Sequence, residues 1–335
     1  MVDYNIIIVN TNNKKMIKGI ANPKLKNPIL IVAWPGMGEV AYRTVLFLRE
    51  VLDFKMFAKL EAGDFFKPAG VIVEKGILSL PHMPAGFFYY YKAKNRPHII
   101  LFLGEAQPPL EYAQNLAEAV IAFAKRYDIK MVISFAAKPE PIDHRSDSKV
   151  WIVATQKDLL ENFKNFNLKI LSEGQISGLN GLILGMSKKM GVKGICLLAE
   201  IPFYTVQIEN PRANVSLLKI IDDYLKLNLN LNPLIERAKF IEAEIDKLMS
   251  YLKGETQTPP PLSEEDIERI KKDLSAYTKL PQSIREKIER LFKEAQKDIS
   301  KARELKDELD HWNVYKDYED RFLDLFKKDK REGIH

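Results

Sequence analysis

Apolar residues in the first two thirds of the chain follow two alternating periods. Five short runs rich in Ile, Val, Leu and Phe have the length of buried strands, at residues 28–34, 98–104, 130–136, 149–155 and 194–200. Between such runs, apolar positions recur every three or four residues and predict helices, as at residues 38–52, 110–127 and 211–225. Strands that alternate with helices build a sheet covered on both faces, so the pattern predicts a three-layer α/β/α sandwich.

One stretch interrupts the alternation. Residues 56–61, 70–78 and 86–93 form three strand-like runs, separated by Gly and Pro, with no helical pattern among them. Strands that follow one another without a crossover helix pair in an antiparallel way. We therefore expect a mixed sheet.

The pattern changes again near Asn232, where strand-like runs end and helical spacing continues in a highly charged sequence. We predict an α/β domain over residues 1–232 and an all-α extension over 233–335, with a proline-rich linker at 255–262. Apolar residues spaced by threes and fours run from Ile284 to Trp312, as in an amphipathic helix or a coiled coil. This stripe must pack either on its own α/β domain or on another subunit, and we expect the subunit contact.

Composition narrows the class of protein. The chain has 335 residues, 46% of them hydrophobic, and a formal net charge of +6 whose Lys and Arg residues are interspersed with acidic ones. No basic stripe for nucleic acid is therefore predicted. A single cysteine, Cys196, suits a reducing compartment. We expect a cytoplasmic protein, because no signal peptide and no membrane-spanning run is recognisable.

Glycine-rich turns raise the question of a nucleotide site. Gly36, Gly38 and Ala41 have the G-x-G-x-x-A spacing between a strand and a helix, and Glu61 ends the next strand. A dinucleotide fold would continue with a crossover helix, whereas strand-like runs follow here, so we interpret these glycines as a tight turn. The five histidines are scattered, and we predict no metal site, no cofactor and no catalytic residue.

A second glycine-rich turn, at residues 174–186, has two interpretations. Gly178, Asn180 and Gly181 can let a helix begin close to the sheet, with Asn180 bonding a neighbouring loop and Ser177 capping the helix. Alternatively, this turn lines a ligand crevice at one edge of the sheet. The candidate crevice residues are Trp34, Pro35, Gly36, Gly38, Glu105, Gly178, Asn180, Gly181 and Glu200.

Glu105 and Glu200 stand out because each follows an apolar run where the chain is about to leave the sheet. A carboxylate in such a place needs a partner. It can act as an acid or base, or it can accept hydrogen bonds from an adjacent loop, and we favour the structural role.

Several segments together resemble the proteasome assembly chaperone 2 family. The resemblance is carried by GQISGLNGLILGMSKKMGVKGICLLAEIPFY (174–204), NPRANVSLLKII (210–221), WPGMGEVAYRT (34–44) and KVWIVATQKDLLENF (149–163), and it spans residues 28–250. It implies a three-layer fold like that of phosphorylases, homo-oligomers, and binding to proteasome α subunits, without catalytic residues.

The resemblance makes a non-enzymatic, chaperone-like interaction protein the leading hypothesis. The alternative is a small-molecule or nucleotide-binding protein, or an enzyme, that uses the crevice. Some archaeal chaperones of this kind end in a hydrophobic-Tyr-any residue tail that inserts between proteasome subunits. Residues 331–335 read REGIH instead, so we expect no tail insertion.

Overall fold

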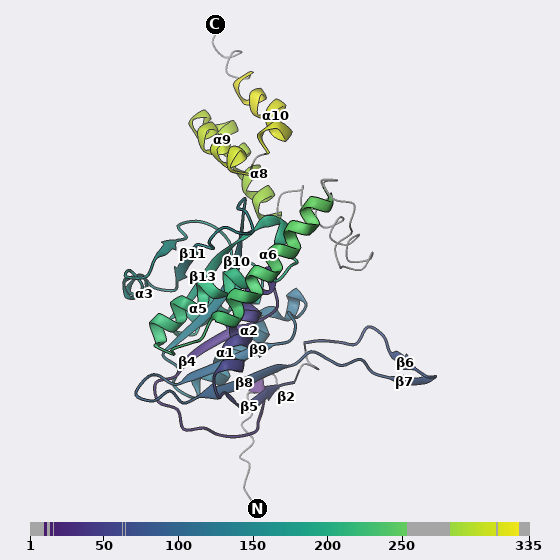
Figure 1. Ribbon diagram of the computed structural model, residues 1–335, viewed down its shortest axis with the longest axis vertical. Coiled ribbons are helices and arrows are strands. Elements are labelled where there is room, and N and C mark those ends of the chain that lie inside the picture. Colours follow the sequence, from purple (N-terminus) through teal and green to yellow (C-terminus); the bar gives the residue numbers. More distant parts are fainter. Residues whose placement is uncertain are drawn as a thin grey trace, which may run out of the picture. The chain divides into compact units, whose positions relative to one another are not determined.

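A nine-stranded mixed sheet forms the centre of the computed structural model, which describes residues 10–11, 14–15, 17–61, 63, 65–252, 282–312 and 314–327 (Figure 1). The spatial order of its strands is β12 (Leu168–Ile170), β11 (Val150–Ala154), β13 (Gly194–Pro202), β10 (Met131–Glu140), β4 (Ile29–Ala33), β9 (Ile99–Gly104), β8 (Gly86–Tyr91), β5 (Lys55–Leu60) and β3 (Ile17–Gly19). Strands β10, β4 and β9 run parallel, whereas β8, β5 and β3 continue the sheet in antiparallel pairs. The predicted mixed sheet is confirmed.

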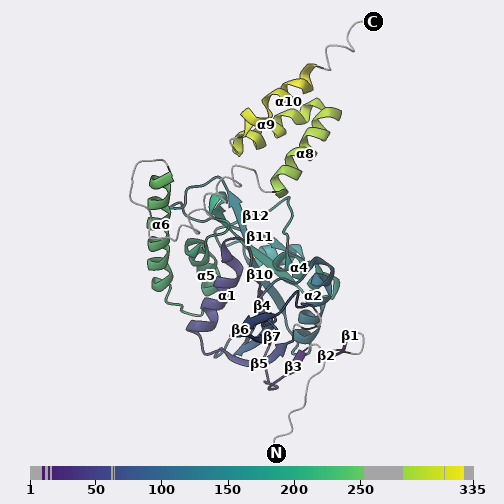
Figure 2. The same cartoon turned by 90° about the vertical axis from the view of Figure 1, so that its right-hand side faces the viewer.

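Helices cover both faces of this sheet, which confirms the three-layer prediction (Figure 2). On one face α1 (Val40–Val51) packs against α5 (Pro211–Leu225), and on the other α2 (Leu110–Lys125) packs against α4 (Leu179–Lys189). Short helix α3 (Lys157–Asn162) links β11 to β12. Two small hairpins, β1 (Asn10–Thr11) with β2 (Lys14–Lys15) and β6 (Ile72–Glu74) with β7 (Ile77–Ser79), lie outside the main sheet. Among the described residues, no helix is long and apolar enough to cross a bilayer.

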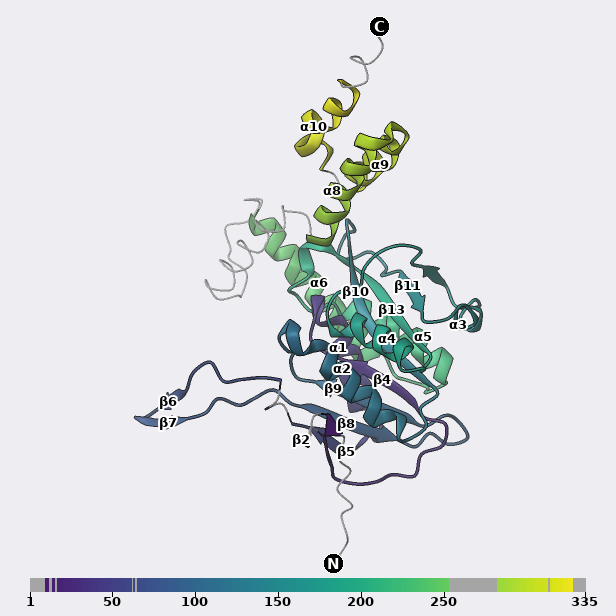
Figure 3. The same ribbon diagram turned by 180° about the vertical axis from the view of Figure 1, so that it is seen from behind.

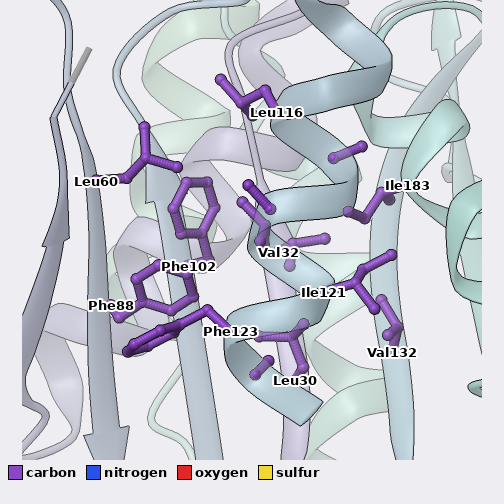
Figure 4. Packing of buried hydrophobic residues seen from close by; sticks show 14 of the residues in the cluster. Leu30, Val32, Leu60, Phe88, Phe102, Leu116, Ile121, Phe123, Val132 and Ile183 are labelled. Atoms are coloured by element: carbon purple, nitrogen blue, oxygen red, sulfur yellow. The ribbon is translucent and has the colours of Figure 1, made fainter. Parts of the chain in front are cut away.

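A core of buried hydrophobic residues lies between the sheet and helices α2 and α4 (Figure 4). Phe88 from β8, Phe102 from β9 and Phe123 from α2 are fully buried there. The ring centroid of Phe88 lies 4.7 Å from that of Phe102 and 4.5 Å from that of Phe123. Such tilted contacts add to the gain from burying the rings. Strands β4 and β9, whose ends form the candidate site, are therefore packed against this buried core.

Cys196 should be unreactive in the folded protein. It lies fully buried in β13, and burial raises the pKa of its thiol to about 12. Because the thiolate is the reactive form, we expect a disulfide reagent at pH 8 to modify Cys196 only after unfolding. Titration of the native and the denatured protein with such a reagent checks this, and fast modification of the native protein would contradict it.

The chain divides into two compact units. The first comprises Met1–Lys138, Asp147–Ile201 and Gln207–Asp246, and the second comprises Pro139–Ser146, Pro202–Val206 and Lys247–His335. Helix α6 (Asn232–Leu252) begins where the composition changes. The linker expected at 255–262 lies outside the described residues.

The apolar stripe expected from Ile284 to Trp312 is not one continuous helix. The chain forms α8 (Gln282–Lys297), the short turn η4 (Ile299–Lys301), α9 (Ala302–His311) and α10 (Tyr315–Lys327). These helices bury a shared core, made of Ile288, Leu291, Phe292, Ala295, Ala302, Leu305, Leu309, Trp312, Phe322 and Leu325. The expectation of a subunit contact along this stripe is wrong for these positions, because the helices of one chain bury them against one another.

Candidate functional site

Three segments meet where the parallel strands β4 and β9 end, and we call residues 34–39, 105–109 and 178–181 the loop cluster. The crossover after β4 runs through α1 on one face of the sheet, and the crossover after β9 runs through α2 on the other. In open α/β sheets, this change of face leaves a crevice outside the strand ends where ligands bind. The loop cluster is therefore the natural place to look for a site.

Trp34 is the aromatic residue of the cluster, and its side chain is fully buried. Its ring lies 5.2 Å from that of Phe102 and packs directly over Gly104, where a Cβ atom would lie 2.2 Å from the indole Nε1. Only glycine fits at that position. Among the described residues the indole N–H has no hydrogen-bond partner, a cost that the packing of the ring must offset.

Asn180 locks the start of α4 to the end of β4. The Trp34 backbone N–H donates to Asn180 Oδ1 at 2.9 Å, and Asn180 Nδ2 donates to the Trp34 carbonyl at 3.0 Å. The amide side chain is almost completely buried. It supplies one acceptor and one donor to the backbone N–H and carbonyl of Trp34, which lies just beyond the end of β4. This confirms that Asn180 bonds a neighbouring loop.

Gln107 joins the same elements, although nothing in the sequence pattern singled it out. Its Nε2 donates to the Pro35 carbonyl at 2.7 Å, and its Oε1 accepts from the Leu179 N–H at 3.0 Å. Gln107 thus caps α4, the role that we expected of Ser177. The N-cap residue is Gly178, and no side chain at that position accepts from a backbone N–H of the first turn. The predicted Ser177 cap is wrong, because a loop distant in sequence occupies that place.

The glycines of the cluster allow close packing. Gly178 has φ 74°, and a Cβ there would lie 2.7 Å from Gln107 Oε1. A Cβ on Gly181 would lie 2.3 Å from the Ile176 carbonyl oxygen. Gly38 has φ 58°, and its Cβ would lie 2.9 Å from Asn210 Nδ2. Each position thus needs glycine for conformation or for space.

Gly36 and Glu61 do not form a dinucleotide site of the ordinary kind. Space beside Gly36 is taken by the side chains of Asn180 and Gln107, whose nitrogen atoms would lie 3.6 and 3.8 Å from a Cβ. Glu61 follows β5, which pairs antiparallel with β8 and is not the parallel neighbour of β4 that a dinucleotide fold requires. The tight-turn interpretation fits this arrangement.

Glu105 follows β9 at the border of the cluster and holds the segment before β8. Its Oε2 accepts from the Ala85 N–H at 2.8 Å and lies 3.3 Å from His82 Nε2. Burial, followed by the negative charge of Glu105, raises the pKa of the Tyr42 hydroxyl. The expected role as an acceptor for an adjacent loop is confirmed for this carboxylate.

Glu200 lies apart from the loop cluster, because β10 separates its strand, β13, from β4. Its Oε1 accepts from Trp151 Nε1 at 2.8 Å, and the side chain is buried. The ammonium groups of Lys138 and Lys169 lie 4.6 and 4.9 Å from the Trp151 ring. Glu200 thus has a structural role, because its hydrogen bond to Trp151 links β13 to the neighbouring strand β11.

Glu200→Gln is expected to lower the free energy of unfolding by about 1–3 kcal/mol, because a neutral amide replaces the buried, charged acceptor of the Trp151 indole N–H. Chemical denaturation measures the loss. Glu173→Gln makes the same change at an exposed position and should leave the midpoint unchanged. An unchanged midpoint for Glu200→Gln would contradict the structural role.

A separate pocket of about 210 Å³ lies beside α1 and the start of α5. Arg43 and Arg237 line it together with Glu209. Arg237 Nε donates to Glu209 at 2.9 Å, and Arg43 Nε lies 3.8 Å from the same carboxylate. Arg43 Nε also donates to Glu39 at 2.6 Å. Both arginines among the described lining residues are thus already paired with carboxylates, which disfavours binding of an anionic ligand there.

Known proteins are similar to this chain in sequence and in fold. An uncharacterized protein of Methanocaldococcus jannaschii is 30% identical over 229 residues, covering 68% of this chain and 88% of that protein. The crystal structure of Pyrococcus furiosus PbaB, an archaeal proteasome activator, matches with a TM-score of 0.61 and 25% identity, over 70% of this chain and 98% of that one. A PAC2 family protein from Streptomyces avermitilis has the same fold, with a TM-score of 0.56 and 20% identity, over 72% of this chain and 99% of that one.

The family model covers all three segments of the loop cluster and every strand of the main sheet except β3 and the first residue of β4. It is the model of the PAC2 family, and it matches residues 30–249, which agrees with the resemblance seen in the sequence over residues 28–250. Since the match includes more than half of the chain, this protein belongs to the PAC2 family.

Proposed function

We propose that the protein is a chaperone-like interaction factor that binds proteasome subunits and acts as a homo-oligomer. The observation that carries the proposal is the PAC2 family match over residues 30–249, together with the likeness to PbaB, an archaeal proteasome activator, along nearly all of that chain. A family of shared fold does not fix the partner, so the partner needs its own test.

The loop cluster has a positioning role in this proposal. Gln107 and Asn180 fill the space beside Gly36 and Gly178, and their amide groups are occupied by backbone partners. Ligand sites need concave space and polar groups that are free to bind. These contacts support a rigid edge of the sheet that presents a surface to another protein.

Reconstitution with purified proteasome α and β subunits from the same cell tests the proposal. We expect the full chain to form a complex with α subunits and to change the rate at which proteasome particles appear on a native gel. The competing function predicts a different result: a nucleotide at a hundred times its Kd would stabilise the protein by about 2.7 kcal/mol. No complex with α subunits, combined with such a stabilisation, would overturn the proposal.

A further inference from the structure

The hairpin of β6 and β7 projects from the α/β unit (Figures 1 and 3), and we call residues 71–80 the arm. The strands pair in register, with Ile72 opposite Ser79 and Val73 opposite Leu78. Lys75 and Gly76 turn the chain with φ 51° and 80°, as a two-residue hairpin turn requires. The sequence thus encodes a regular two-stranded ribbon.

One face of the arm is entirely apolar and open to solvent. Side chains on alternate positions of a ribbon share a face, so this face carries Val71, Val73, Leu78 and Leu80, which are 50%, 63%, 64% and 69% exposed. The opposite face is mixed and carries Ile72, Glu74, Ile77 and Ser79. An isolated hairpin of this size is marginally stable in water, so its apolar face calls for a partner surface.

The charges at the tip of the arm favour a protein over a lipid bilayer as that partner. Glu74 and Lys75 are exposed where the ribbon turns, at the end that would enter the hydrocarbon first. Charged side chains are costly in that environment. A face that lies flat against another protein leaves both charges in water.

The same chain carries a surface that suits the arm. On the face of the sheet where α1 packs over β4 and β9, the next strands keep Met56, Phe87 and Tyr89 exposed or partly exposed, and we call these three residues the receiving surface. Met56 lies opposite Tyr89, and 44% of it is exposed. Arg49 and Lys59 lie over the rings of Tyr89 and Phe87 at 5.6 and 5.8 Å. The surface thus combines an exposed methionine with two aromatic rings that have cations above them, and Met, aromatic residues and Arg are enriched at interfaces.

We propose that the arm of one copy docks on the receiving surface of a second copy, and that the second arm docks on the first copy in return. This inference rests on the self-association in the proposed function and names the surfaces that make it. The apolar face of the arm offers on the order of 300 Å², whereas a stable interface takes roughly 800 Å² from each partner. Two arms that touched only each other would fall short of that area. A reciprocal exchange makes each copy contribute both an arm and a receiving surface, as a two-fold symmetric contact does.

Light scattering on the full chain at micromolar concentration tests the role of the arm. The wild type should have at least twice the mass of one chain, and Val73→Lys with Leu78→Lys should reduce the mass to that of one chain. Ile72→Lys with Ile77→Lys places the same charges on the opposite face of the same strands and should keep the wild-type mass. All four positions are exposed, so circular dichroism should show every variant folded.

Cross-linking identifies the surface that receives the arm. Leu78→Cys in one preparation and Met56→Cys in another should form a disulfide-linked dimer when they are mixed and oxidised, since the native Cys196 is buried. A dimer from Leu78→Cys alone, without a mixed dimer, would overturn the receiving surface. A wild type with the mass of one chain would refute self-association itself, and an oligomer that survives Val73→Lys with Leu78→Lys would refute only the arm. Binding to proteasome α subunits is measured separately and distinguishes these failures from failure of the proposed function.

Discussion

Asn180→Ala is expected to lower the free energy of unfolding by about 2–6 kcal/mol. The substitution leaves the N–H and the carbonyl of Trp34 without their partner in a buried place, and each unpaired group costs about 1–3 kcal/mol. It also removes the two hydrogen bonds by which Asn180 ties α4 to the end of β4. Denaturant unfolding followed by circular dichroism measures the loss.

Two further variants make the result specific to this contact. Asn180→Asp keeps an acceptor for the Trp34 N–H and loses the donor to the Trp34 carbonyl, while it buries a charge, so it should also be destabilised. Asn115→Ala makes the same change at an exposed position of α2 and should be neutral or slightly stabilising. Equal stability of Asn180→Ala and Asn115→Ala would show that the amide does not hold the loop cluster.

Phe292→Ala should destabilise the packed helices α8, α9 and α10 by about 3–5 kcal/mol, because it removes a fully buried ring from their shared core. Phe292 also stacks on Tyr318 at 5.9 Å and lies beneath the Arg321 guanidinium at 4.1 Å. Hydrogen exchange read by mass spectrometry should show faster exchange in α8–α10, with β4 and β9 still protected.

Phe326→Ala is the matched control for Phe292→Ala, since this phenylalanine of α10 is 44% exposed. It should cost less than Phe292→Ala, because 44% of Phe326 stays in water in the folded chain, whereas Phe292 is fully buried. If both variants exchanged as the wild type does, the core assigned to α8–α10 would be wrong.

The spacing of apolar residues predicted helices well where one face of the helix is buried. The helix expected at residues 211–225 is α5, Pro211–Leu225, and the proline stands at its first turn, where its missing N–H costs nothing. The antiparallel pairing of β5 with β8 could also be predicted, because no crossover helix separates the runs between residues 56 and 93. The middle run, at residues 70–78, differs from the expectation, because it pairs within itself as β6 and β7 outside the main sheet.

Contacts between distant segments could not be predicted in the same way. Gln107 meets Pro35 and Leu179 only after β4, β9 and α4 are in place, and a glutamine in a loop carries no periodic signal. Conversely, Glu105 and Glu200 looked alike in the sequence, and the strand order put them in different surroundings.

The break in the C-terminal stripe had a local signal that the spacing of apolar residues concealed. The Asp298 side chain accepts from the Ser300 N–H at 3.0 Å, as an N-cap residue does, and so begins a new helical segment after α8. The spacing continues across this cap, and the helices therefore fold against one another and bury the stripe within the chain.

Capture of the tagged full chain from its own cell tests the central claim most directly. Under native conditions and with a tag-only control, we expect mass spectrometry of the recovered complex to show proteasome α subunits in near-stoichiometric amounts. Folded protein that is recovered without proteasome subunits, at expression levels where those subunits are present in the lysate, would contradict the account.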